Sequence, residues 1–128
     1  MIIALRAILV LGGLLLGFIG FGFFMDPAAS GADFGISPGG ASEAHGLTSI
    51  RADFTAFFVV GGASLIWGAL AKRGDALVIG GALMLVTLFG RVVSLSIHGS
   101  FDGFLPPMAV EAVLGIAALI GARVLPRA

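Results

Sequence analysis

A charged residue that could take part in chemistry, Arg91, stands inside an apolar stretch of the chain. An arginine at the centre of a lipid-embedded helix costs about 2.5–3.5 kcal/mol on insertion scales, so such residues pair with a counterion or line a polar cavity. Glu111 lies near the start of the next apolar stretch. Because the intervening turn is short, we expect two antiparallel neighbours in which Arg91 and Glu111 meet, roughly 9 Å inside the end of the span.

Three more polar residues follow Arg91 in the direction of that turn. Ser94 and His98 come three and seven positions later, a spacing that places them on the same helix face as Arg91. Asp102 lies within the turn itself. We therefore expect His98 and Asp102 to roof the group that Arg91 and Glu111 form.

Arg51 and Asp53 stand at the start of another apolar stretch. Two positions apart on a helix, they face different ways, so we expect one of them to join the Arg91–Glu111 group. The predicted polar cluster therefore consists of Arg51, Asp53, Arg91, Ser94, His98, Asp102 and Glu111.

Three interpretations of this cluster follow from the residue types. It holds helices in register and does nothing else; or it forms the polar wall of a pocket that binds an amphipathic molecule; or Glu111, Asp53 or His98 acts as an acid or base. The two histidines, His45 and His98, lack companions at metal- or haem-binding spacing, so we predict no metal site. The residues identify no cofactor.

The composition explains why these residues stand out. Of the 128 residues, 59% are hydrophobic and 11% are charged, whereas a soluble domain has roughly 25% charged residues. The formal net charge is zero and cysteine is absent. The first value argues against a nucleic-acid partner, and the second excludes disulfides and thiolate metal sites.

Four apolar stretches organise the chain into one predicted membrane domain over 1–128. No alternation of polar and apolar residues suggests strands, so each stretch is expected to be a helix, which satisfies its own backbone in lipid. The predicted fold is an all-α, integral membrane four-helix transmembrane bundle, and its partner is the lipid bilayer. Its spans are about 2–24, 49–70, 76–97 and 107–124.

The 25–48 segment between the first two spans is predicted to be a loop, because it is rich in Gly, Pro and Ser. A loop this long either covers something or is a tether, and the sequence leaves both readings open. Thr48 or Ser49 is expected to cap the second span.

Lys and Arg in short loops predict the orientation of the bundle. The basic residues at the side of the two termini are Arg6, Lys72, Arg73, Arg123 and Arg127. The positive-inside rule then places both termini in the cytoplasm and the predicted polar cluster on the outer side of a plasma (inner) membrane. Small residues such as Gly13, Gly17, Gly61 and Gly62 are expected to bring the helices close together.

Several short motifs resemble those of a known family. Arg51-Ala52-Asp53-Phe54, the Gly61-Gly62 span, Gly90-Arg91-Val92-Val93-Ser94, Asp102-Gly103 and Glu111 are similar in order and spacing to bacterial four-helix membrane proteins classed as DUF4345. The similarity covers about 47–122. It implies the same topology and the same polar positions, and no activity, since the family is defined by a domain of unknown function. The layout is more loosely similar to DoxX-like proteins.

Three functional hypotheses remain at this point. The first is binding of a lipophilic molecule, such as a quinone, an isoprenoid or a lipid, in the outer half of the bundle. Six phenylalanines could line that site: Phe21, Phe23, Phe24, Phe54, Phe57 and Phe58. The second is an accessory subunit of a larger membrane complex. The third is a membrane enzyme that acts on a hydrophobic substrate through Glu111 or Asp53.

Overall fold

The structure is a computed structural model that describes residues 1–128, and it is entirely helical. The elements in chain order are α1 (Ile2–Met25), α2 (Pro27–Asp33), α3 (Glu43–Ser49), the π-helical segment η1 (Ile50–Phe54), α4 (Thr55–Leu70), α5 (Gly74–His98), α6 (Leu105–Val124) and the 3-10 segment η2 (Leu125–Arg127). Four helices are long and apolar enough to cross a membrane: Ile2–Met25, Glu43–Leu70, Gly74–His98 and Leu105–Arg127.

The predicted loop over 25–48 is wrong in part, because it contains two short helices. Asp26 caps α2, since its side chain accepts a hydrogen bond of 3.0 Å from the Ala29 amide, and Pro27 occupies the first helical turn. Ser42 caps α3 by accepting from the His45 amide at 3.2 Å. The expected cap at Thr48 or Ser49 is therefore wrong, and the second span begins earlier than predicted, at Glu43.

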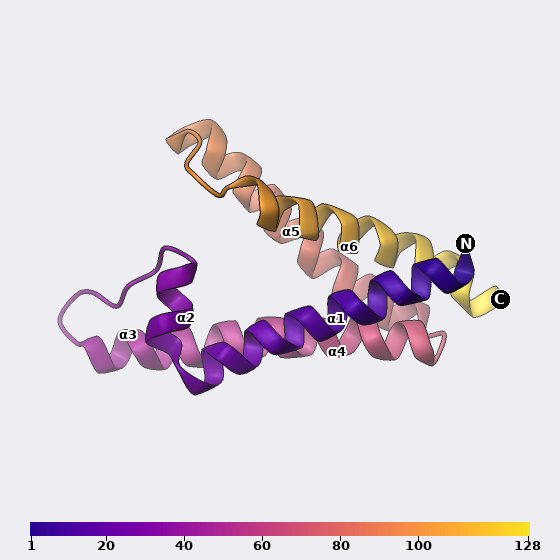
Figure 1. The fold of residues 1–128 in the computed structure, drawn as a ribbon, viewed down its shortest axis with the longest axis horizontal. Coiled ribbons are helices and arrows are strands. Elements are labelled where there is room, and N and C mark those ends of the chain that lie inside the picture. Colours follow the sequence, from indigo (N-terminus) through magenta and orange to yellow (C-terminus); the bar gives the residue numbers. More distant parts are fainter.

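Both chain termini and the α4–α5 turn lie at one end of the molecule, here called the termini end (Figure 1). The Lys72 ammonium donates to the Ala128 carbonyl there. The opposite end, called the far end, carries α2, α3 and the 99–104 turn. Gly99 ends α5 with a φ of 82°, a backbone conformation that favours glycine, and its amide donates to the Leu95 carbonyl at 2.9 Å.

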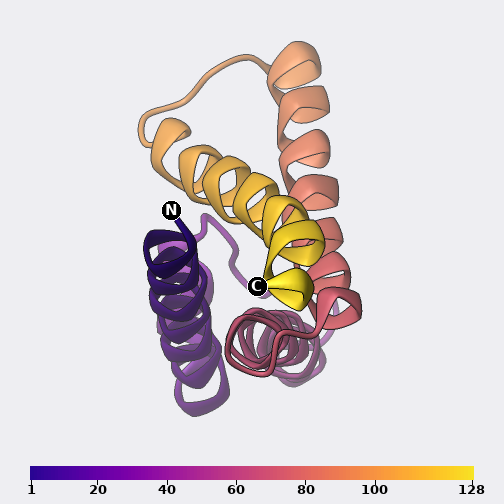
Figure 2. The same ribbon diagram turned by 90° about the vertical axis from the view of Figure 1, so that its right-hand side faces the viewer.

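The four long helices form two pairs that converge at the termini end and diverge toward the far end (Figure 1). α1 packs along α4, and α5 packs along α6. In the end view, α6 lies between α1 and α5 (Figure 2), and the pairs are held together by contacts of α4 with α5 and, less extensively, of α1 with α6. The helical bundle is therefore closed over only part of its length.

Close backbone approach explains why α1 and α4 pack tightly. A Cβ atom on Gly62 would lie 2.5 Å from the Gly13 carbonyl oxygen, and one on Gly13 would lie 2.7 Å from the Gly62 carbonyl oxygen. Any larger residue at either position would push the two backbones apart. The predicted packing role is thus confirmed for Gly13 and Gly62, whereas a Cβ atom on Gly17 would have no neighbour within 4 Å, so the prediction is wrong for Gly17.

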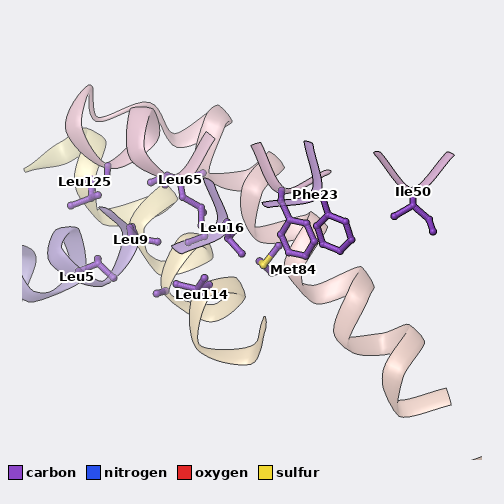
Figure 3. Packing of buried hydrophobic residues seen from close by; sticks show 14 residues of the cluster. Leu5, Leu9, Leu16, Phe23, Ile50, Leu65, Met84, Leu114 and Leu125 are labelled. Carbon is purple, nitrogen blue, oxygen red and sulfur yellow. The ribbon is translucent and has the colours of Figure 1, made fainter. Parts of the chain in front are cut away.

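Buried apolar side chains follow the line along which the two pairs meet. Leu9, Leu65 and Leu125 are fully buried and gather near the termini end, whereas Phe23 and Met84 continue the core toward the far end (Figure 3). Ile50 stands apart from the other labelled core residues, close to the loop. The core is thus continuous where the pairs touch and thins where they separate.

Candidate functional site

The expected ion pair between α5 and α6 is present where the two helix pairs diverge. Arg91 Nε donates to Glu111 Oε1 at 2.7 Å, and the side chains are 30% and 9% exposed, respectively. Glu111 is the only charged residue among the buried ones. Its second oxygen, Oε2, is buried without a hydrogen-bond partner. A carboxylate oxygen in this situation retains the capacity to accept a hydrogen bond.

Asp53, and not Arg51, is the residue from η1 that shares a cavity with this pair; its side chain is exposed and forms no hydrogen bond with either partner. Asp53 lines the same cavity as Arg91 and Glu111. Arg51 instead donates from Nε to the Phe24 carbonyl at 2.9 Å, across to the end of α1. The guanidinium therefore sits at the C-terminus of a helix, where the macrodipole favours positive charge.

A π-helical segment brings Asp53 to this position. η1 spans Ile50–Phe54 within the otherwise continuous helix that runs from Glu43 to Leu70. Such wide turns are rare and occur frequently at functional sites. Asp53 and Phe54 belong to the wide turn and both line the cavity, so the irregular backbone lies where the polar wall of the site is built.

The cavity has a volume of about 310 Å³ and is here called the aromatic–charged pocket. Three walls contribute to it: the 34–58 region, α5 and α6. Its lining residues are Phe34, Asp53, Phe54, Phe57, Phe58, Thr87, Arg91 and Glu111. Ligand sites in proteins are typically of about this size or larger, mostly apolar and fitted with a few convergent polar groups.

A smaller, more apolar cavity of about 90 Å³ adjoins this pocket. Arg91, Glu111 and Phe58 line both cavities. The smaller one reaches between α1 and α6, where its walls include Leu16 and Val110. The charged pair thus stands at the junction of a cavity with mixed aromatic and charged walls and a more apolar one, an arrangement that suits an amphipathic molecule.

Aromatic stacking makes one wall of the pocket rigid. Phe23 is fully buried and stacks on Phe54 at 4.9 Å and on Phe58 at 5.6 Å between ring centroids. Phe34 contacts the Phe23 ring at 5.3 Å and the Phe58 ring at 5.7 Å. Such pairs contribute about 0.5–1.5 kcal/mol beyond the area they bury. The ring of Phe57 meets Phe58 edge-on at 5.0 Å.

Some sequence-predicted residues lie elsewhere. His98 and Asp102 are exposed, and neither lines the pocket, so the expected roof is wrong. Ser94 lines a different cavity of about 130 Å³, which Arg91 shares and which Phe101 and Phe104 cover. His98 lies away from the pocket because it ends α5, and the part of α5 beyond Arg91 diverges from α1 and α4 (Figure 1).

The prediction that phenylalanines line the site holds in part. Phe54, Phe57 and Phe58 line the pocket, and Phe23 supports them. Phe21 and Phe24 point outward, with 60% and 55% of their surface exposed. Phe34 was missed, because it lies in the segment predicted to be a loop. The sequence offers one signal for this position, an aromatic residue next to a glycine, Gly35. In the structure, Gly35 has a φ of 72° and lies in the turn that follows α2.

Metal binding finds no support in the side-chain arrangement. No three His, Asp or Glu side chains approach one another closely enough to hold an ion. The charged groups that line the pocket are the Arg91 guanidinium and the carboxylates of Asp53 and Glu111.

Fold and site together define an all-helical protein with four candidate membrane-spanning helices and a half-open aromatic–charged pocket. Comparison with family models, curated proteins and solved structures finds no match to this chain. The resemblance to DUF4345 and DoxX-like proteins therefore stays a prediction.

Proposed function

We propose that this chain is a multi-pass membrane protein that binds a lipophilic small molecule, such as a quinone, an isoprenoid or a lipid, in the aromatic–charged pocket. One observation carries the proposal: the Arg91–Glu111 pair lines a cavity of about 310 Å³ together with four phenylalanines, instead of being enclosed between packed helices. Ionisable residues within membrane spans usually face a cavity or a partner and mark a functional site.

The apolar surface of the molecule supports the membrane part of the proposal. Large hydrophobic side chains on all four long helices are exposed, including Phe18, Trp67, Phe89 and Ile116. Exposed apolar surface of this extent is costly in water and favourable in lipid. The bilayer is therefore the solvent that these helix faces fit.

The orientation proposed for the bundle follows from its charge. Five basic residues and one acid lie at the termini end: Arg6, Lys72, Arg73, Arg123, Arg127 and Asp75. We assign this end to the cytoplasm of a plasma (inner) membrane, so the pocket opens outward. Since the chain has no cysteine, Ser100→Cys and Ala128→Cys can be labelled singly. A membrane-impermeant maleimide should modify Ser100→Cys in intact cells and Ala128→Cys only after lysis. The reverse pattern would invert the orientation.

Native mass spectrometry of the protein in a mild detergent tests the binding proposal. We expect a lipophilic mass to accompany the wild-type chain and to be lost from the double variant Arg91→Leu/Glu111→Leu, which removes both charges of the pair and so leaves neither of them without its partner. Phe89→Ala is the matched control, because Phe89 is 70% exposed and outside the pocket. Absence of a bound mass from the wild type, or its retention by the double variant, would contradict the proposal.

A second candidate function, an accessory subunit of a larger membrane complex, draws on a different surface. A Cβ atom added to Gly17 or Gly90 would have no neighbour within 4 Å, so the small size of these glycines is not used inside the bundle. A groove beside α4 and α5, lined by Ile79, Leu83 and Val86, is also open. The same mass spectrum tests this candidate, which predicts co-purifying polypeptides and no small lipophilic mass.

A further inference from the structure

The charges that line the aromatic–charged pocket do not balance. It contains two carboxylates, Asp53 and Glu111, and one guanidinium, Arg91. Arg91 and Glu111 neutralise each other through their hydrogen bond of 2.7 Å. The Asp53 carboxylate forms no ion pair, so the pocket carries a formal excess of one negative charge.

No cation forms an ion pair that cancels this excess. Arg51 is the closest basic residue in the chain, but its Nε donates to the Phe24 carbonyl and no ion pair joins it to Asp53. The rest of the far end is also acidic, with Asp26 and Asp102 between helices and Asp33 at the end of α2. Clefts lined by one sign of charge raise the local concentration of ligands of the opposite sign.

The buried oxygen of Glu111 points to the same chemistry. Oε2 has no hydrogen-bond partner, and the side chain is 9% exposed. An ionised carboxylate only accepts hydrogen bonds, so the group that satisfies it must be a donor. An ammonium group supplies donors and positive charge together, whereas a carboxylate or phosphate head would meet two carboxylates and a single guanidinium, whose Nε is already bonded to Glu111.

The aromatic lining favours a cation as well. Phe34, Phe54, Phe57 and Phe58 lie around the same cavity as Asp53. The face of an aromatic ring is electronegative and attracts a cation within about 6 Å of its centre, an arrangement used to recognise substituted ammonium groups. Stacking on Phe23 holds Phe54 and Phe58 in place, so these two rings lose little freedom when a ligand binds.

We propose that the ligand of this pocket is a lipophilic ammonium compound, with its positive head between Asp53 and the phenylalanines and its chain directed into the adjoining apolar cavity. This inference rests on the proposed ligand-binding function and assigns the ligand's chemical class. The Asp53 carboxylate is the group that selects for positive charge, and the Arg91–Glu111 pair forms the inner boundary of the head-group site.

Three probes with the same alkyl chain test the charge preference: decylammonium, decanol and decanoate. Each is titrated into the full chain in a non-ionic detergent, and binding is measured by calorimetry. We expect decylammonium to bind about tenfold more tightly than decanoate, with decanol between them. Equal or tighter binding of decanoate would overturn the ammonium assignment.

A pair of variants locates the effect at Asp53. Asp53→Asn should reduce the preference for decylammonium to about threefold or less, because only the aromatic attraction remains. Asp102→Asn makes the same chemical change at an exposed far-end position outside the pocket, and should leave the preference unchanged. Equal effects of the two variants would show that the field of the far end, and not the pocket, selects the probe, and would overturn the assignment.

The outcomes separate this inference from the function on which it rests. A co-purified neutral or anionic lipid, together with tighter decanoate binding, would keep the pocket as a ligand site and overturn only the ammonium class. No bound mass and no probe binding would overturn both.

Discussion

Different side chains join the helices at the two ends of this molecule. From the termini end to the middle of the helices, backbones approach through glycines, as at Gly13 and Gly62, and buried leucines such as Leu9 and Leu65 fill the remaining space. Toward the far end, stacked rings join α1 to η1 and α4, a charged pair joins α5 to α6, and cavities of about 310 and 90 Å³ lie between the two helix pairs.

The charges of the two ends differ in the same way. The termini end has a formal excess of four positive charges, from five basic residues and one acid, and the far end has six acids and two arginines, an equal excess of negative charge. Arg73 and Asp75 form an exposed pair at the termini end, 2.6 Å apart. Its hydrogen bonds to Asp75 raise the pKa of the Arg73 guanidinium. The two ends therefore carry opposite charge, and the pocket lies toward the acidic one.

The largest expected effect concerns the Arg91–Glu111 pair. Arg91→Leu should lower the free energy of unfolding by about 3 kcal/mol, because it leaves the Glu111 carboxylate buried without a partner. The double variant Arg91→Leu/Glu111→Leu should lose much less than the sum of the two single changes. Thermal unfolding in detergent measures the stability of the four proteins in this double-mutant cycle: the wild type, Arg91→Leu, Glu111→Leu and the double variant. Additive losses would show that the pair does not couple α5 to α6.

The next largest effect is expected where α1 and α4 approach closely, in the half of the molecule nearer the termini end, here called the closed half; the half nearer the far end is called the open half. Gly62→Ala should lower the free energy of unfolding by about 2 kcal/mol, because the new methyl group meets the Gly13 carbonyl, a backbone atom that cannot turn away. Gly90→Ala is the matched control in the open half, where no atom lies within 4 Å of the added Cβ. It should be neutral or slightly stabilising. Equal losses in the two variants, measured by thermal unfolding, would remove the distinction between the halves.

A third prediction concerns Phe34, which lines the aromatic–charged pocket in the open half. Phe34→Ala removes one wall of the pocket and should weaken binding of the co-purified molecule or of decylammonium about tenfold. The unfolding temperature should change little, since Phe34 is already 36% exposed. Phe89→Ala, an aromatic-to-alanine change outside the pocket, is the control for binding. Unchanged affinity in Phe34→Ala would exclude α2 and its following turn from the site.

The smallest effect is expected at the exposed pair of the termini end. Asp75→Asn breaks the contact with Arg73, but both side chains are more than half exposed, and ion pairs in water contribute little. The unfolding temperature should therefore stay within experimental scatter. A loss comparable with that of Arg91→Leu would mean that burial does not distinguish the two pairs.

Much of the fold could be predicted from residue order. Three of the four long apolar helices lie close to their predicted limits, and the second ends where predicted but begins at Glu43, because apolar length and turn-forming residues act locally. The pairing of Arg91 with Glu111 could also be predicted, since a short turn between two helices places their facing residues at similar depth. The helices over 27–33 and 43–49 were missed, because Gly- and Ser-rich composition hid the caps at Asp26 and Ser42.

The choice between Arg51 and Asp53 could not be made from sequence, because it depends on the π-helical turn and on the distant Phe24 carbonyl. The place of Phe34 depends likewise on how α2 folds back against the Phe23 and Phe58 rings. Similarly, His98 shares a helix face with Arg91 but leaves the site because its helix diverges from α1 and α4. Each of these is a relation between segments far apart in the chain.

The sequence by itself determined that four apolar helices form and that Arg91 and Glu111 face each other, because helix length, turns and the cost of a buried charge are properties of neighbouring residues. Only the tertiary structure decided that the pair lines a cavity. That outcome depends on where the α1–α4 pair parts from the α5–α6 pair, and the contacts that hold the pairs together, such as Gly12 with Leu114 and Gly80 with Leu65, join segments far apart in the chain.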